Sequence, residues 1–66
     1  MQVIVNGACQ EIASAVTLQR LLEQLDLGKG RLAIEVNGEI VPRSAFNSHV
    51  LRHGDAIEIV QAIGGG

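Results

Sequence analysis

The fold is decided within residues 1–25, MQVIVNGACQEIASAVTLQRLLEQL, which pass from an alternating apolar pattern through an Asn-Gly pair to a leucine stripe. In residues 1–5, Met1, Val3 and Val5 alternate with Gln2 and Ile4. This alternation is typical of a half-buried strand in which the three residues named first face a core and Ile4 lies on the other face. Asn6-Gly7 is a strong signal for a tight hairpin turn, because both central positions of that turn need positive φ. The segment therefore predicts a hairpin whose second strand covers residues 8–13.

A short amphipathic helix is expected after the hairpin. Thr17 is its predicted N-cap, since a threonine hydroxyl can accept a hydrogen bond from an otherwise unpaired amide of the first turn. The leucines that follow recur with the spacing i, i+3, i+4, i+7 and so share one face. They are Leu18, Leu21, Leu22 and Leu25. Gly28 is expected to stop the helix in a left-handed conformation.

Further strands are predicted in the second half of the chain. Residues 32–36 alternate and end at a second Asn-Gly turn, after which residues 39–41 form a short strand; the proline that follows at 42 confines this strand to a sheet edge. Ser44 is expected to cap one helical turn over residues 45–48, with Phe46 buried. A final strand is predicted around Ile57 and Ile59, again by alternation.

The predicted order is strand, strand, helix, strand, strand, strand. This is the order of the β-grasp (ubiquitin-like) fold, an α+β architecture in which a mixed sheet of four to five strands packs on one helix. A sheet with one helix across one face also gives the leucine stripe a covering surface. We expect the β-grasp domain to cover residues 1–61 and a flexible glycine tail to cover residues 62–66.

Composition excludes several classes of function. The chain of 66 residues is 47% hydrophobic and 18% charged, which suits a single small domain with an aliphatic core. The formal charge is -2 and the basic residues are scattered, whereas affinity for nucleic acid rests largely on neutralising phosphates. No apolar run reaches the length of a membrane span, and the first residues do not resemble a signal peptide. We expect no nucleic-acid or membrane partner and a cytoplasmic location.

Side chains able to do chemistry are few and lie apart in the sequence. Cys9 is the sole cysteine, has no catalytic motif around it and is expected to be a buried or half-exposed structural residue. His49 and His53 fall in a turn-rich stretch and lack the ligand spacing of a zinc site. We therefore expect no catalytic residue, no metal, no bound cofactor, and a protein that is not itself an enzyme.

The end of the chain has no evident role in folding. Its three glycines have no side chains to pack, so the alternatives are a frayed tail and a functional one. Residues without Cβ atoms can thread a narrow channel and bring a terminal carboxylate to the active site of a partner. A carboxylate becomes a good acyl donor once it is joined to AMP, and the partner must supply the ATP, since this chain has no phosphate-loop pattern. We expect Gly66 to carry the reacting carboxylate, and the tail threading into partner enzymes to be formed by Ala62, Ile63, Gly64 and Gly65.

Four stretches occur in an order that is specific within so short a chain: LLEQL at 21–25, IVPR at 40–43, GD at 54–55 and IEIVQ at 57–61, all before the diglycine end. In these stretches the chain resembles the ThiS family, the small ubiquitin-like sulfur carriers of bacterial thiamin biosynthesis. The resemblance implies a β-grasp fold whose last strand lies parallel to the first at the centre of the sheet.

The resemblance also implies a route for sulfur. An adenylating enzyme of the ThiF type, using ATP and magnesium, would convert the carboxylate of Gly66 to an acyl-adenylate. Sulfur from a cysteine desulfurase would then replace AMP and leave a thiocarboxylate. The thiazole synthase ThiG would take this sulfur into the thiazole ring, and the carrier would be a monomer when free.

Partner enzymes must also grip the domain itself. Ile4 and Val60 point away from the inferred core face and would be neighbours if the first and last strands pair. An exposed aliphatic patch commonly marks an interaction surface, although singly exposed apolar residues are also ordinary. Ile4 and Val60 are therefore the candidate partner surface.

Two other readings of the sequence stay open. A MoaD-like sulfur carrier for molybdopterin synthesis would share the fold, the diglycine end and the thiocarboxylate, although its members are generally longer and residues 40–43 suit ThiS better. A β-grasp protein-binding module that is not a carrier would use only its sheet surface, with the glycines incidental. Such a module should tolerate a C-terminal tag, whereas a carrier should not.

Overall fold

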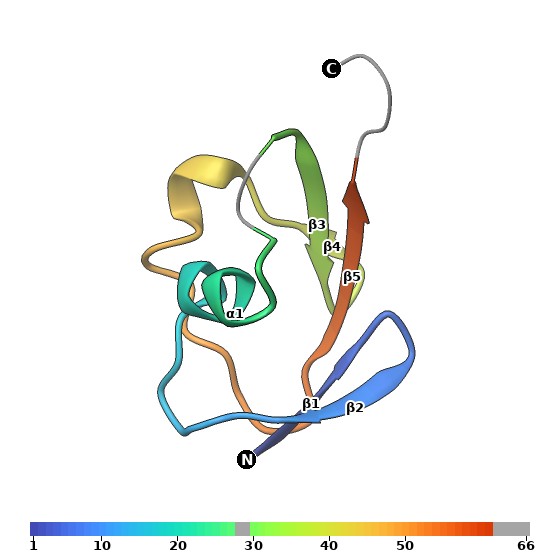
Figure 1. The fold of residues 1–66 in the computed structure, drawn as a ribbon, viewed down its shortest axis with the longest axis vertical. Helices are drawn as coiled ribbons and strands as arrows, with labels where there is room; N and C mark the ends of the chain where they lie inside the picture. Colours follow the sequence, from blue (N-terminus) through green and yellow to red (C-terminus); the bar gives the residue numbers. More distant parts are fainter. Residues whose placement is uncertain (28–29, 62–66) are drawn as a thin grey trace.

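The structure is a computed structural model that describes residues 1–27 and 30–61. Within these ranges the chain forms strands, one α-helix and one 3-10 turn in the predicted order (Figure 1). The elements are β1 (Gln2–Val5), β2 (Ala8–Glu11), α1 (Leu18–Gln24), β3 (Leu32–Val36), β4 (Glu39–Ile40), the 3-10 turn η1 (Arg43–Ala45) and β5 (Ala56–Gln61). The strands β2 and β4 are shorter than predicted, and the division into a domain and a tail at residue 61 stays a prediction.

The strands form one mixed sheet with the order β2-β1-β5-β3-β4. The first and last strands, β1 and β5, are parallel, and the other neighbouring strands are antiparallel. The last strand therefore lies at the centre of the sheet, with β1 on one side and β3 on the other. This is the β-grasp arrangement that the sequence predicted, and β4 occupies the edge expected from the proline at its end.

Both Asn-Gly pairs make the turns that were predicted. Asn6 and Gly7 have φ values of 49° and 84°, and Asn37 and Gly38 have values of 54° and 83°. Two successive residues with positive φ give a two-residue hairpin turn whose twist matches that of the strands. The turns therefore join β1 to β2 and β3 to β4 as tight antiparallel hairpins.

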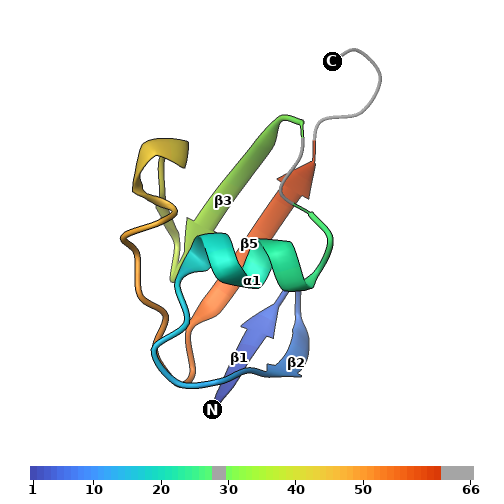
Figure 2. The same ribbon diagram turned by 60° about the vertical axis from the view of Figure 1, so that its left-hand side comes forward.

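The core lies between α1 and one face of the sheet. Figure 2 shows α1 lying across that face, and the other face has no covering element among the residues described. The buried hydrophobic residues form one cluster: Val3, Val5, Ile12, Val16, Leu18, Leu21, Leu22, Ile34, Val36, Val41, Phe46, Leu51, Ile57 and Ile59. We call the uncovered side of the sheet the open face.

The helix begins as predicted but ends differently. The hydroxyl of Thr17 accepts a hydrogen bond from the amide of Arg20 at 3.2 Å, which confirms the N-cap. Among the described residues, the first to adopt the left-handed conformation after the helix is Asp26, with φ 59°. Its amide donates to the carbonyl of Glu23, and the next amide, of Leu27, donates back to Leu22, so the last turn closes before Gly28 is reached. Gly28 itself lies outside the described residues.

The short turn before β5 also differs from the prediction. Ser44 does not cap it, because the 3-10 turn begins one residue earlier and encloses Ser44. Pro42 occupies the N-cap position without a side-chain hydrogen bond, and its ring suits the extended backbone there. Phe46 is buried, as predicted, with the guanidinium carbon of Arg43 5.7 Å from the centre of its ring.

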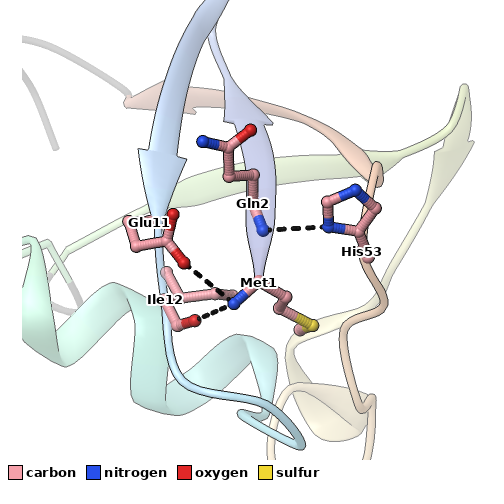
Figure 3. Close-up of polar contacts among 5 residues, drawn as sticks. All are labelled: Met1, Gln2, Glu11, Ile12 and His53. Atoms are coloured by element: carbon pink, nitrogen blue, oxygen red, sulfur yellow. Dashed lines mark hydrogen bonds and ion pairs between the residues drawn. The ribbon is translucent and has the colours of Figure 1, made fainter.

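Polar contacts anchor the N-terminal end of β1 (Figure 3). The ammonium of Met1 lies 3.0 Å from the carboxylate of Glu11 and donates to the carbonyl of Ile12 at 2.7 Å. On the other side, the amide of Gln2 donates to Nδ1 of His53 at 3.1 Å. The hydrogen bond and the positive charge of the N-terminal ammonium hold the pKa of Glu11 below its ordinary value.

Candidate functional site

The central strand β5 leads directly into the segment that the sequence marks as functional. On one side, the amides of Ile4 and Asn6 donate to the carbonyls of Asp55 and Ile57, both at 2.9 Å. On the other side, the ladder with β3 continues to the last described residue, where Leu32 pairs with Gln61. The strand is therefore fixed in the sheet up to Gln61. The residues predicted to thread and react, Ala62, Ile63, Gly64, Gly65 and Gly66, lie outside the described residues.

The asparagines of the two hairpin turns hold β5 from opposite sides. The carboxamide of Asn6 accepts from the amide of Ile59 at 2.7 Å and donates to its carbonyl at 3.2 Å. The carboxamide of Asn37 accepts from the amide of Ala56 at 2.9 Å and donates to the carboxylate of Asp55 at 3.0 Å. Sequence reasoning assigned both asparagines to turn geometry alone. The sequence signal for these contacts was asparagine at the first position of each turn, since its side chain offers both a hydrogen-bond donor and an acceptor.

The open face carries the exposed aliphatic side chains nearest to the end of β5. Val60 is 64% exposed and lies opposite Ala33 of β3, while Ile40 of the edge strand is 74% exposed. A hollow of about 200 Å³ borders Val60 and is lined by Arg31, Leu32 and Ala33. Since Val60 directly precedes Gln61, a partner that contacts this side of the sheet would also lie close to the last described residue.

The prediction that Ile4 and Val60 are neighbours is wrong. Both residues do lie on the open face, but the register of the two parallel strands places Ile4 beside Ala56, four residues before Val60. At about 3.3 Å per residue, this separates them by roughly 13 Å along the sheet. Ile4 is also the less exposed of the two, at 38%. The aliphatic residue that accompanies Val60 at this end of the open face is Ile40, which the sequence analysis did not select.

The remaining candidate side chains do not converge. Cys9 is exposed and lies opposite Ile4 on the second strand, so it is not the buried or half-exposed residue that was expected. Within residues 1–27 and 30–61, no group of three or more His, Cys, Asp or Glu side chains could hold a metal ion. Among the same residues, no helix has the length and apolar character needed to cross a membrane.

Comparison with known proteins gives consistent matches. Residues 3–66 match the family model described as the ThiS family. The chain is 38% identical over 66 residues to the sulfur carrier protein ThiS of Escherichia coli (strain K12), covering 100% of both chains. It is 36% identical to a thiazole synthase of Paramagnetospirillum magneticum, where the match covers 100% of this chain and 20% of that protein. The crystal structure of a thiamine biosynthesis protein (ThiS) from Geobacter metallireducens superposes with a TM-score of 0.85 at 32% identity, covering 100% of both chains.

Proposed function

The chain belongs to the ThiS family, and on that premise we propose that it is a sulfur carrier of thiamin biosynthesis whose working group is the carboxylate of Gly66. The observation that carries this proposal is the full-length match to a protein named as a sulfur carrier. The fold of the chain agrees with that of the ThiS structure from Geobacter metallireducens. Because a MoaD-like carrier would share this fold, it is the match of residues 3–66 to the ThiS family model that favours the thiamin pathway over the molybdopterin alternative.

The relatives named thiazole synthase support one partner in particular. In such proteins from Paramagnetospirillum magneticum and Magnetococcus marinus, a segment similar to this whole chain makes up 20% of a longer protein. Each of these proteins named thiazole synthase therefore contains a carrier-like segment within its own polypeptide. This supports a thiazole synthase of the ThiG type as the acceptor of the sulfur.

The proposed chemistry takes place at the end of the chain. A ThiF-type partner binds ATP with magnesium, the carboxylate of Gly66 attacks the α-phosphate, and pyrophosphate leaves. A persulfide that carries sulfur from a cysteine desulfurase attacks the resulting acyl-adenylate and expels AMP, which forms an acyl disulfide. A thiol then attacks the outer sulfur of this acyl disulfide and forms a new disulfide with it, and the thiocarboxylate on Gly66 leaves. The carrier supplies the carboxylate and no catalytic group, so the protein is not itself an enzyme. We expect these steps to take place in the cytoplasm.

The position of β5 supports this use of the tail. A strand held by hydrogen bonds on both sides fixes the place from which Ala62 to Gly66 start. The glycines at 64 and 65 have no Cβ atoms to obstruct a narrow channel. Val60, together with Ile40 on the same open face, offers an aliphatic surface close to that start. Ile4 is a separate candidate beside Ala56, the first residue of β5.

Intact-protein mass spectrometry tests the proposal. The untagged protein is incubated with ATP, magnesium, a ThiF-type enzyme and a sulfur source, beside a variant that lacks Gly66. We expect the full-length chain alone to gain the mass that corresponds to exchanging one oxygen for sulfur. If neither protein changes while the same enzyme sulfurates the Escherichia coli carrier, the proposed function is wrong.

A further inference from the structure

Two glutamates of the open face lie directly opposite each other. The register between β3 and β5 pairs Glu35 with Glu58, and β4 places Ile40 on the other side of Glu35. Two positions along the same ladder, Ala33 lies opposite Val60. These five residues line a hollow of about 270 Å³, which we call the acidic hollow. The acidic hollow is thus lined by two glutamates and three aliphatic residues.

This arrangement is unfavourable for the domain on its own. Like charges directly opposite each other on neighbouring strands destabilise a sheet. The ion pairs found among residues 1–27 and 30–61 join Glu11 to the N-terminal ammonium and Glu23 to Arg20, so neither includes Glu35 or Glu58. Both glutamates are exposed and neither packs in the core. Folding therefore gives no reason for two negative charges between exposed aliphatic side chains.

We propose that the acidic hollow receives an arginine presented by an apolar surface of the adenylating partner enzyme. The proposal rests on the proposed function, which supplies that partner. Opposed residues on antiparallel strands have Cβ atoms about 5 Å apart, so one planar guanidinium can donate to both carboxylates. The aliphatic side chains of Ala33, Ile40 and Val60 would exclude water around this contact, which strengthens the charge interaction.

Charge complementarity decides between this occupant and the others. A second copy of the chain, docked through the same face, would bring two more glutamates against the first pair. A phosphate-bearing ligand would also be repelled by them. A cationic side chain neutralises the pair and relieves the repulsion between Glu35 and Glu58 on binding. The hollow also lies beside Val60, at the end of the sheet from which the tail starts.

The test is the affinity of the full chain for a ThiF-type enzyme, measured by isothermal titration calorimetry without ATP. The double variant E35Q/E58Q keeps the shape of both side chains and removes their charges. We expect its Kd to be higher than that of the wild type by about tenfold or more, and to depend less on salt concentration. The control E23Q/D26N removes the same number of negative charges from the helix side of the molecule, and its Kd should stay near the wild-type value.

The results distinguish failure of the docking proposal from failure of the proposed function. If E35Q/E58Q binds as tightly as the wild type, or if the wild type does not bind the enzyme, the acidic hollow is not the docking site. If the wild type binds, the double variant binds weakly and neither protein is sulfurated, the docking proposal stands and the proposed function fails. Urea unfolding of E35Q/E58Q should show a folded protein at least as stable as the wild type, since the substitutions remove a repulsion.

Discussion

Asn6 bonds to the backbone of Ile59 with both ends of its carboxamide, although 53 residues separate the two in sequence. The side chain thus acts as one more residue of β1 in the parallel ladder with β5, beyond the point where the backbone of β1 turns away into its hairpin. Both hydrogen bonds are partly buried. Ile59 is itself a core residue, so Asn6 joins the first hairpin to the strand that leads to the tail.

The substitution Asn6→Gly should weaken the domain. Glycine keeps the φ of 49° at this position, so the change removes the two side-chain bonds without straining the turn. Leaving a partly buried amide and carbonyl without partners costs about 1–3 kcal/mol, and we expect a loss of that size in the free energy of unfolding, measured with urea.

Asn37→Gly is the matched control for this prediction. Asn37 begins the other hairpin turn with φ 54°, and its two side-chain bonds are exposed. Water can replace exposed bonds, so the loss should be smaller. Equal losses for the two variants would mean that burial of the Asn6 bonds does not determine their contribution.

The parts of the fold that the sequence predicted are those with local signals. The Asn-Gly turns, the cap at Thr17 and the leucine stripe each depend on residues within a few positions of one another. The register between β1 and β5 depends on segments more than 50 residues apart, so the predicted contact of Ile4 with Val60 was wrong although both faces were assigned correctly. Gly66 stays a prediction from the sequence, made because the terminal glycines have no side chains to pack. The acidic hollow could not be predicted, because it exists only once three strands are paired.

The substitution Asp26→Gly should stabilise the domain. Asp26 follows α1 with φ 59°, a conformation that costs most residues roughly 1–2 kcal/mol and that glycine adopts freely. The variant also removes a negative charge from the helix C-terminus, where negative charge is unfavourable. Glycine loses more backbone entropy on folding, so the net gain should be about 0.5–1 kcal/mol in urea unfolding.

Two further substitutions at Asp26 separate the causes. Asp26→Asn removes the charge and keeps a side chain that tolerates positive φ, so it should give only a small part of the gain. Asp26→Ala should destabilise the domain, because alanine tolerates positive φ poorly. A stable Asp26→Ala variant would contradict the left-handed closure of α1.

The ion pair between Glu11 and the N-terminal ammonium predicts a pH dependence of stability. The pKa of Glu11 in the folded chain is lowered by the hydrogen bond from the ammonium and by its charge, with smaller contributions from the side chain of Gln2 and from His53. A lowered folded-state pKa contributes stability that is present above the unfolded-state value and is lost as the pH falls through the folded-state value. Glu11→Gln should therefore reduce the difference in stability between about pH 7 and about pH 3.

An NMR titration of the Glu11 side chain checks the cause directly. In the chain that begins with the free amine of Met1, the pKa should lie below the ordinary glutamate value. Acetylation of that amine removes the charge and the donor, and the pKa of Glu11 should rise. An unchanged pKa after acetylation would show that the ammonium is not the cause.

The substitution Val60→Asp should leave the fold intact and weaken use of the carrier by its adenylating partner. Val60 is 64% exposed, so the free energy of unfolding should change by no more than about 1 kcal/mol. If the partner contacts this end of the open face, the kcat/KM of adenylation should fall by about tenfold, which corresponds to about 1.4 kcal/mol. The exchange of labelled pyrophosphate into ATP measures this rate.

Ile4→Asp is the control on the same face, because the register of β1 with β5 places it roughly 13 Å from Val60 along the sheet. Its effect on adenylation should be the smaller of the two. Val60 and Glu58 line the same hollow, so aspartate at 60 would add a third carboxylate to it. Val60→Ser removes the aliphatic contact without adding charge and so separates the two effects. Normal adenylation rates in both Val60→Asp and Val60→Ser would remove this end of the open face from the partner surface, because a partner in contact with Val60 would lose its aliphatic contact in each variant.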